Sequence, residues 1–205
     1  DLVHDTDIVV ISDEVYEQLV YDGQRHCSVL QYPELRERSF AVYSFGKVYH
    51  NTGWKIGYCV APPASSKAFR RIHQFLAFSV HTPAQMALAG YLSQPHPPVH
   101  AMMQQKRDHF LDMIRTLPFT IYTPSAGSYF QIAGYERISA LPDTEFAQWL
   151  TTTCGVATIP VSAFYQNRKD DRLIRFCFAK KDETLSDAIR QMQGGIKTVT
   201  QQTDE

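Results

Sequence analysis

The chain has 205 residues, of which 44% are hydrophobic and 20% are charged. This composition indicates a folded protein of one or two domains and argues against a disordered chain. The formal net charge of −1 provides no bulk electrostatic attraction for nucleic acid or an anionic membrane, so we expect neither as a partner. The longest apolar runs are too short to span a bilayer.

Four cysteines form no C-x-x-C pair, and their spacing fits no zinc site, so we expect no bound metal. Cys59 and Cys177 stand in apolar runs, which predicts buried thiols. A reduced, cytoplasmic location is the natural interpretation. The chain shows no signal peptide and opens at Asp1, without methionine, in what resembles the polar end of a helix, so we expect further sequence upstream.

The first half of the chain alternates apolar runs with helical periodicity. Residues 8–11 are all Ile or Val, which predicts a strand buried on both faces, as in a parallel sheet. The aromatic side chains Phe69, Phe75 and Phe78 are expected in the core rather than in a substrate pocket. Further strands are predicted at 40–43 and 56–61, and helices at 66–78 and 82–92, the second with Thr82 as N-cap before Pro83.

The proline-rich segment 94–98 is the clearest break in the chain, and it leaves His96 and His100 as expected loop histidines. Smaller elements follow it, which predicts an α+β layer and a domain boundary at 95/96. The polar tail from Gly194 onward is expected to fray. The expected strands are 119–122, 128–132, 156–160 and 173–179, and the expected helices are 99–117, 143–153 and 184–193.

Residues 44–58 form a loop that carries two lysines between two predicted strands. Lys47, at the end of an apolar strand, is well placed for an amine that must be partly desolvated to act as a nucleophile. Asp13 follows the strand 8–11, and ligands of open parallel sheets collect outside the carboxyl ends of the strands. A carboxylate, the phenol of Tyr16 and an amine would together suit pyridoxal 5′-phosphate, which has a protonated ring nitrogen, a phenolic oxygen and an aldehyde.

Four segments in order resemble the signatures of class I and II pyridoxal-phosphate-dependent aminotransferases of fold type I. They are Ser12-Asp13-Glu14-Val15-Tyr16, Ser44-Phe45-Gly46-Lys47, Thr52-Gly53-Trp54-Lys55-Ile56-Gly57-Tyr58 and Ile174-Arg175-Phe176-Cys177-Phe178-Ala179. Within the family, the chain is most similar to bacterial methionine-preferring and kynurenine (glutamine transaminase K-like) aminotransferases. The resemblance covers essentially the whole chain. It implies an α/β fold in which residues 1–95 end a mostly parallel, cofactor-binding large domain and residues 96–205 form an α+β small domain.

The resemblance also implies the residues that hold the cofactor. Asp13 would pair with the pyridine nitrogen, and Tyr16 would hydrogen-bond the phenolic oxygen. Lys47 would form the Schiff base and then act as the base that moves the α-proton. Ser44 and Lys55 would hold the phosphate; many family members have arginine where this chain has Lys55, and lysine supplies a point charge there.

The implied reaction is transamination between an L-amino acid (methionine, aromatic or glutamine-like) and a 2-oxo acid, with Arg175 binding the substrate α-carboxylate. The family's N-terminal half is absent from this chain. It normally supplies a glycine-rich phosphate loop, an aromatic that stacks on the ring, an asparagine beside the phenolic oxygen, and groups of the dimer partner. We therefore expect a homodimer completed by that missing segment, and an isolated chain that is inactive.

Other functions remain open at this point. An apolar strand followed by Asp-Glu is also typical of a Walker B motif, but no G-x-x-x-x-G-K-[ST] occurs. A non-catalytic ligand-sensing or regulatory module would retain the same residues, and a lyase acting by β-elimination or decarboxylation would use the same lysine.

Each candidate residue also has a structural alternative. Lys47 and Lys55 could be solvated loop charges. Tyr16 could be ordinary core packing, and Arg175 could belong to a structural ion pair.

Overall fold

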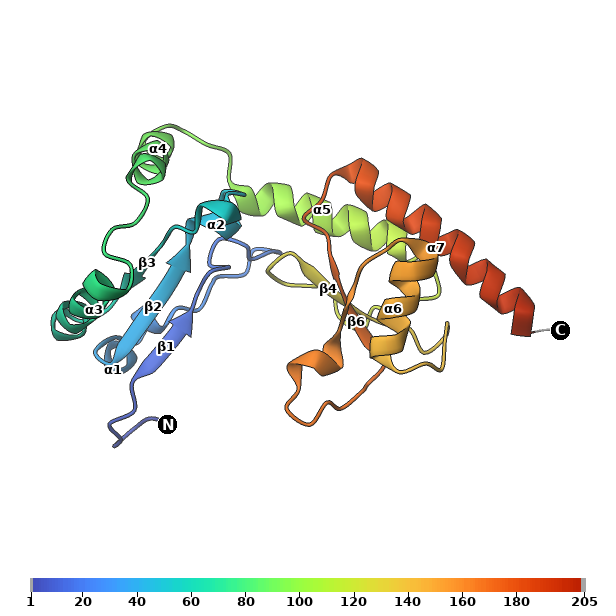
Figure 1. Cartoon of the computed structure of the whole chain (residues 1–205), viewed down its shortest axis with the longest axis horizontal. Helices are drawn as coiled ribbons and strands as arrows, with labels where there is room; N and C mark the ends of the chain where they lie inside the picture. Colours follow the sequence, from blue (N-terminus) through green and yellow to red (C-terminus); the bar gives the residue numbers. More distant parts are fainter. Residues whose placement is uncertain (1, 204–205) are drawn as a thin grey trace. The chain divides into compact units, whose positions relative to one another are not determined.

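A computed structural model describes residues 2–203 of the chain, with side chains over residues 2–197, and divides it into two compact units, 1–100 and 101–205. Helices and strands are mixed in both units (Figure 1), in agreement with the predicted α/β class. No helix within residues 2–203 is long and apolar enough to cross a membrane.

The first unit is built on a three-stranded sheet in the order β1-β2-β3 (Figure 1). β1 (Val10–Asp13) runs parallel to β2 (Ser39–Ser44), and β3 (Gly57–Val60) runs antiparallel to β2. The register pairs Asp13 with Val42, and Ser44 with Gly57. The carboxyl ends of β1 and β2 and the start of β3 therefore share one edge of the sheet.

Helices of the first unit lie between and after these strands. The helices predicted over 66–78 and 82–92 are confirmed as α3 (Pro63–Leu76) and α4 (Thr82–Leu92), although the N-cap of α4 is His81 and not Thr82. The expected loop 44–58 contains two short helices. The remaining elements of the unit are η1 (Val29–Gln31), α1 (Pro33–Arg36), α2 (Phe45–Val48) and η2 (Thr52–Trp54).

The first unit exposes apolar side chains that the sequence predicts to be buried. Ile11 on β1 is 74% exposed, and Phe75 and Phe78 are 86% and 82% exposed. The predictions of a doubly buried strand and of an aromatic core at these positions are therefore wrong for this chain. β1 is an outer strand of its sheet. A run of hydrophobic residues is therefore not enough to bury it, because burial also needs another element packed against the strand.

The second unit has an antiparallel sheet in the order β4-β6-β5, formed by Phe130–Gly134, Leu173–Cys177 and Ile159–Pro160. The strand predicted at 119–122 is wrong, because a single bridge from Thr120 to Gly134 stands in its place. The other elements are α5 (Val99–Ile114), which begins at the unit boundary, α6 (Asp143–Cys154), η3 (Val161–Phe164) and α7 (Asp182–Thr203).

The second unit has a closed apolar core. Tyr135, Phe146, Leu150, Ile174 and Phe178 are all fully buried. The rings of Tyr135 and Phe146 are stacked, with centroids 3.9 Å apart. The alternation of small strands and helices predicted for this half is confirmed. Cys59 and Cys177, the two cysteines expected to be buried, are both only half-buried.

The last helix differs from its prediction. α7 continues to Thr203, so the expected fraying from Gly194 is wrong for residues 194–203, and residues 204–205 lie outside the described chain. A Cβ on Gly195 would clash with the Cys154 sulfur of α6. Gly195 therefore permits close helix packing, and it does not mark a helix end.

Candidate active site

Five of the predicted site residues lie at one edge of the first sheet. Asp13 is the last residue of β1, and Tyr16 follows three residues later. Ser44 ends β2, and Lys47 lies in the short helix α2 directly after it. Lys55 stands two residues before β3, whose first residue pairs with Ser44. A parallel pair plus one antiparallel strand thus brings these polar groups to the edge where ligands of α/β sheets bind.

The segment after β1 forms a turn over residues 15–18. The Asp13 carboxylate is exposed at the strand end and accepts a hydrogen bond from the Val15 N–H at 3.2 Å. The Leu19 N–H donates to the Tyr16 carbonyl at 2.8 Å, and Tyr16 is half-buried. These local bonds fix the direction in which the chain leaves the strand, and the Asp13 carboxylate remains accessible to solvent.

The turn that carries Lys47 is tightly built. The Ser44 hydroxyl caps α2 by accepting from the Gly46 N–H at 3.1 Å, and the Thr52 hydroxyl donates to the Gly46 carbonyl at 3.0 Å. A Cβ on Gly46 would lie 2.8 Å from the Thr52 Cα, so only glycine allows this approach. Lys47, the next residue, is half-buried on a rigid turn.

Lys55 has an unusual backbone. Its φ of 56° and ψ of 42° place this non-glycine residue in the left-handed region, which costs about 1–2 kcal/mol. Its N–H donates to the Thr52 carbonyl at 3.3 Å. Strain of this kind persists where the surrounding structure imposes it, and it gathers at functional sites. Here it accompanies an exposed cation beside the strand ends.

Glu14, between Asp13 and Tyr16, is a buried carboxylate whose role the sequence did not reveal. It is only 3% exposed. One oxygen accepts from the Val29 N–H at 3.0 Å, and the other accepts from the Tyr43 hydroxyl at 2.9 Å and pairs with His26 Nε2 at 2.9 Å. No local pattern could have found these contacts, because the partners lie 12 to 29 residues away in the chain.

The pKa of Glu14 reflects two opposing effects. Burial raises it, and hydrogen bonds from His26, Ser28, the Val29 N–H and Tyr43 outweigh burial and lower the pKa to about 2. Glu14 is therefore ionised at neutral pH. An ionised carboxylate only accepts hydrogen bonds, so His26 must carry a proton on Nε2.

Aromatic rings line the strand ends. Tyr43 on β2 stacks on Tyr58 of β3 with centroids 4.7 Å apart, and Phe45 lies 5.3 Å from Tyr58. Burial and the nearby Glu17 carboxylate raise the pKa of Tyr58 to about 12. Its phenol stays protonated at neutral pH and can donate a hydrogen bond.

A hollow of about 420 Å³ lies in the first unit beside these elements. Tyr49 and Glu17 line it together with His26, His96 and His100. His96 is a loop residue, as expected, but His100 lies in the first turn of α5, so its assignment to a loop is wrong. Among the residues whose placement is described, no cluster of His, Cys, Asp and Glu is arranged to hold a metal ion.

Arg175 lies in the second unit, on β6. Its guanidinium carbon is 3.9 Å from the ring centroid of Phe130 and 4.7 Å from that of Phe164. The Arg175 Nε is buried and has no hydrogen-bond partner among the described residues. A buried N–H without an acceptor is unfavourable, and a bound carboxylate would satisfy it. Phe164 was not predicted from sequence, since nothing local connects it with Arg175.

The comparisons with known proteins point to one family. A family model described as aminotransferase class I and II matches residues 1–192. The methionine aminotransferase of Escherichia coli (strain K12) is 48% identical over 192 residues, covering 91% of this chain and 49% of its own length. Kynurenine–oxoglutarate transaminase 1 of Mus musculus is 36% identical over 203 residues, covering 87% of this chain and 48% of its own length.

Solved structures agree with the sequence matches. A crystal structure that identifies an Escherichia coli methionine aminotransferase superposes with a TM-score of 0.86 at 47% identity, covering 92% of this chain and 50% of that one. N-Succinyldiaminopimelate aminotransferase from Mycobacterium tuberculosis gives a TM-score of 0.83 at 33% identity, covering 91% and 49%. The chain spans about half the length of the relatives it matches.

Proposed function

The chain belongs to the class I and II aminotransferases, and we propose that it carries the lysine-bearing part of a transaminase active site. Its fold is that of the fold-type-I enzymes, and pyridoxal 5′-phosphate is the cofactor of this family. The observation that carries the proposal is the placement of Asp13, Tyr16, Ser44, Lys47 and Lys55 at one edge of the sheet.

The chemistry of these residues fits the cofactor. Asp13 supplies an exposed carboxylate for a pyridinium proton, and Lys47 supplies an amine for an aldehyde. Ser44 and Lys55 supply a hydroxyl and a cation for a phosphate. The close approach of Gly46 to Thr52 keeps the turn between the hydroxyl and the amine compact.

The proposed roles follow from these groups. When bound, pyridoxal phosphate supplies an electron sink for the electron pair that is left when the substrate Cα–H bond breaks. Asp13 would hold the proton on the ring nitrogen, and Tyr16 would donate a hydrogen bond to the phenolic oxygen. Lys47 would bind the aldehyde carbon and, once the substrate amine has displaced it, would carry a proton on its free Nζ from the substrate Cα. Ser44 and Lys55 would anchor the phosphate.

Arg175 would bind the substrate α-carboxylate. Its buried Nε lacks an acceptor in the described chain, and a carboxylate can accept two parallel hydrogen bonds from a guanidinium. Phe130 and Phe164 pack on the guanidinium and would limit its rotation. We assign the first unit to the cofactor-binding large domain and the second unit to the small domain.

The substrates and partners of the whole protein are inferred from its relatives. We propose an L-amino acid such as methionine, or an aromatic or glutamine-like one, and a 2-oxo acid, since the matched proteins are named as methionine and kynurenine aminotransferases. We propose that turnover needs a homodimer and a segment corresponding to the other half of those relatives, and that this chain alone is inactive. Four free cysteines support a reducing, cytoplasmic location.

An absorbance titration of the chain with pyridoxal phosphate tests the proposal. The wild type should develop a visible band at stoichiometric cofactor, and Lys47→Ala should not. Lys67→Ala is the matched control, because Lys67 is an exposed lysine of α3 in the same unit, and it should keep the band. A band that survives in Lys47→Ala, or that disappears equally in Lys67→Ala, would contradict the assignment.

Turnover is tested in the protein completed with the companion segment. L-Methionine should remove the visible band and release a 2-oxo acid in equal amount, and a 2-oxo acid should restore the band. Release of ammonia or carbon dioxide would identify a lyase. A band that amino acids leave unchanged would identify a sensor that binds the cofactor without reaction.

A further inference from the structure

Glu14 lies outside the set of residues proposed to touch the cofactor, and it is the most completely enclosed carboxylate of the first unit's strand ends. It is 3% exposed, and its donors include the Val29 N–H, the Tyr43 hydroxyl and His26 Nε2, which lie at 2.9–3.0 Å. Burying a carboxylate is unfavourable unless such donors compensate. An apolar side chain would fill the same space without that requirement, so the carboxylate calls for a specific explanation.

The donors come from segments that are distant in sequence. Glu14 itself directly follows β1, and its N–H donates to the Val42 carbonyl of β2 at 2.8 Å. Tyr43 immediately precedes Ser44 at the end of β2. His26 and Val29 belong to the connection between β1 and β2. One carboxylate therefore joins the end of β1, the end of β2 and the connecting segment.

The third strand is joined through an aromatic contact. The Tyr43 ring that donates to Glu14 stacks on Tyr58 at 4.7 Å, with the planes 13° apart. Tyr58 follows Gly57, which pairs with Ser44 in the register and stands two residues after Lys55. A displacement of Tyr43 would thus move the chain on both sides of the lysine-bearing turn, at the end of β2 and at the start of β3.

We propose that Glu14 is a positioning residue, which acts through Tyr43 and the 26–29 segment to hold Asp13, the Ser44–Lys47 turn and Lys55 at fixed relative positions. Groups that bind a cofactor need a supporting shell whose hydrogen bonds fix their geometry. The effect on cofactor binding rests on the proposed function. The effect on the strand ends does not, and the two are measured separately.

Glu14→Gln is the principal variant. It keeps the size of the side chain but replaces one acceptor oxygen by an NH₂ donor, so either the Val29 N–H or the Tyr43 and His26 donors lose their acceptor. Tyr43→Phe removes one donor and keeps the ring stack on Tyr58. If Glu14→Gln does not fold, Tyr43→Phe takes its place in the same measurements.

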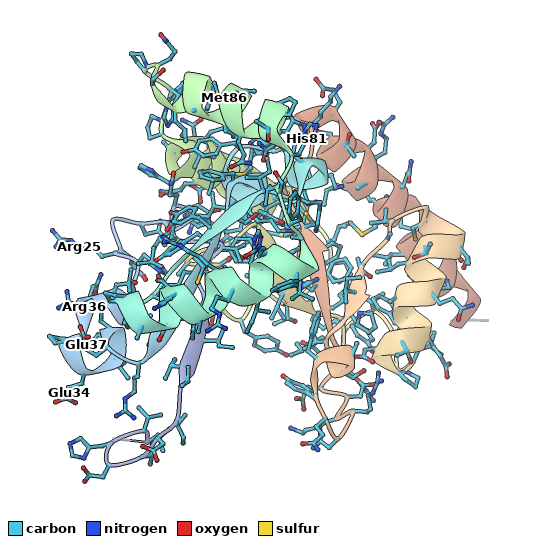
Figure 2. All side chains as sticks on the ribbon, turned by 60° about the vertical axis from the view of Figure 1, so that its left-hand side comes forward. Arg25, Glu34, Arg36, Glu37, His81 and Met86 are labelled. Atoms are coloured by element: carbon cyan, nitrogen blue, oxygen red, sulfur yellow. The ribbon has the colours of Figure 1, made fainter. Side chains whose placement is uncertain are left out.

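Two controls separate positioning from general loss of stability. Leu88→Ala opens a cavity at a buried α4 residue of the same unit, in a cluster with Ile56 and Ala84 on which Phe45 also packs, so it lowers stability without touching the Glu14 hydrogen bonds. Glu34→Gln removes an exposed carboxylate from α1, which Figure 2 shows pointing away from the sheet. This variant should behave as the wild type.

Amide hydrogen exchange is the first readout and needs no cofactor. Glu14→Gln should increase exchange at residues 13–17 and 43–47, and Tyr43→Phe should do so more weakly. Leu88→Ala should increase exchange in α4 and around Phe45, which packs on the same cluster, but should leave residues 13–17 at wild-type rates. Unchanged exchange at residues 13–17 in Glu14→Gln, or an equal increase there in Leu88→Ala, would overturn the proposal.

Affinity for pyridoxal phosphate is the second readout. Glu14→Gln should bind the cofactor about tenfold more weakly than the wild type, at the lower end of the losses that follow when outer-shell partners of metal ligands are removed. The double variant with Tyr43→Phe should be no weaker, because both changes break one network. Equal weakening in Leu88→Ala would reduce Glu14 to a stabilising residue. If the wild type binds no cofactor, the proposed function fails, and hydrogen exchange alone decides the role of Glu14.

Discussion

The two units differ in how far they enclose their largest apolar side chains. In the second unit Phe146, Ile174 and Phe178 are fully buried. In the first unit Ile11, Phe75 and Phe78 are 74–86% exposed. The same unit places its candidate cofactor residues at the open edge of a three-stranded sheet. The second unit buries these side chains in its own core, whereas several large apolar side chains of the first unit are not buried within this chain.

This contrast separates stability from function. The first unit leaves Ile11, Phe75 and Phe78 exposed, and the chain spans about half the length of its relatives. Met86 of α4, labelled in Figure 2, adds a further exposed apolar side chain to the first unit. We therefore expect substitutions in the second unit to change folding, and substitutions at the sheet edge to change binding.

The largest difference is expected between two phenylalanines. Phe146→Ala empties a site that stacks on Tyr135 and should lower the free energy of unfolding by about 3–5 kcal/mol. Phe75→Ala removes an exposed ring and should change it by less than about 0.5 kcal/mol. Urea unfolding followed by circular dichroism measures both. Equal losses would show that the first unit is packed as tightly as the second.

Acid should weaken the stability that the buried Glu14 carboxylate contributes at the sheet edge of the first unit. Hydrogen bonds lower the pKa of Glu14 to about 2 from 4.5, so its contribution is complete above pH 4.5 and is lost as the pH falls toward 2. The shift corresponds to about 3 kcal/mol.

The measurement is the stability difference between the wild type and Glu14→Gln from pH 7 to pH 3. This difference should shrink as the solution becomes more acidic, because protonation removes from the wild type what the variant already lacks. A difference that stays constant over this range would show that the charge of Glu14 contributes nothing.

A matched pair of aspartates gives the next effect. The buried Asp143 of the second unit accepts from the Ser162 N–H and hydroxyl, both at 2.7 Å. Asp143→Ala leaves that N–H without a partner and should cost about 2 kcal/mol. Asp13→Ala, at an exposed position, should leave thermal unfolding unchanged and abolish tight binding of pyridoxal phosphate. A loss of stability in Asp13→Ala together with a loss of cofactor binding in Asp143→Ala would contradict this comparison.

The smallest expected effect is at Lys55, where one substitution should change both stability and cofactor affinity. Lys55→Gly relieves the left-handed backbone at φ 56° and should raise stability by about 1 kcal/mol. Since it also removes a proposed phosphate ligand, affinity for pyridoxal phosphate should fall. Lys55→Asn, which tolerates this backbone better than lysine, is the control. A gain in both stability and affinity would exclude Lys55 from the phosphate site.

Local signals were sufficient for some elements and misleading for others. Pro83 in the first turn and the break after Leu92 bound α4 as predicted, because proline effects act within a few residues, although the N-cap is His81 and not Thr82. Gly194 and Gly195 suggested a helix end, but α7 continues through them, since close contact with Cys154 of α6 favours glycine. That contact is tertiary and leaves no trace in the neighbouring sequence.

The same distinction applies to the site. The order of four motifs predicted Asp13, Tyr16, Ser44, Lys47, Lys55 and Arg175, and the fold places the first five at one edge. Glu14 is part of a predicted motif, yet its enclosure depends on Tyr43, His26 and Val29. The two rings on Arg175 likewise come from distant parts of the chain. Sequence motifs thus indicate groups that touch a ligand, and only the fold reveals the groups that hold them.

Identification of the lysine that bonds to the cofactor tests the proposed site most directly. The chain is incubated with pyridoxal phosphate, reduced with borohydride and digested, and the modified peptide is identified by mass spectrometry. We predict one stoichiometric pyridoxyl group on Lys47, with Lys55 and Lys67 unmodified. Modification spread over several lysines, or concentrated at a lysine other than Lys47, would contradict the assignment of the active site to this edge of the sheet.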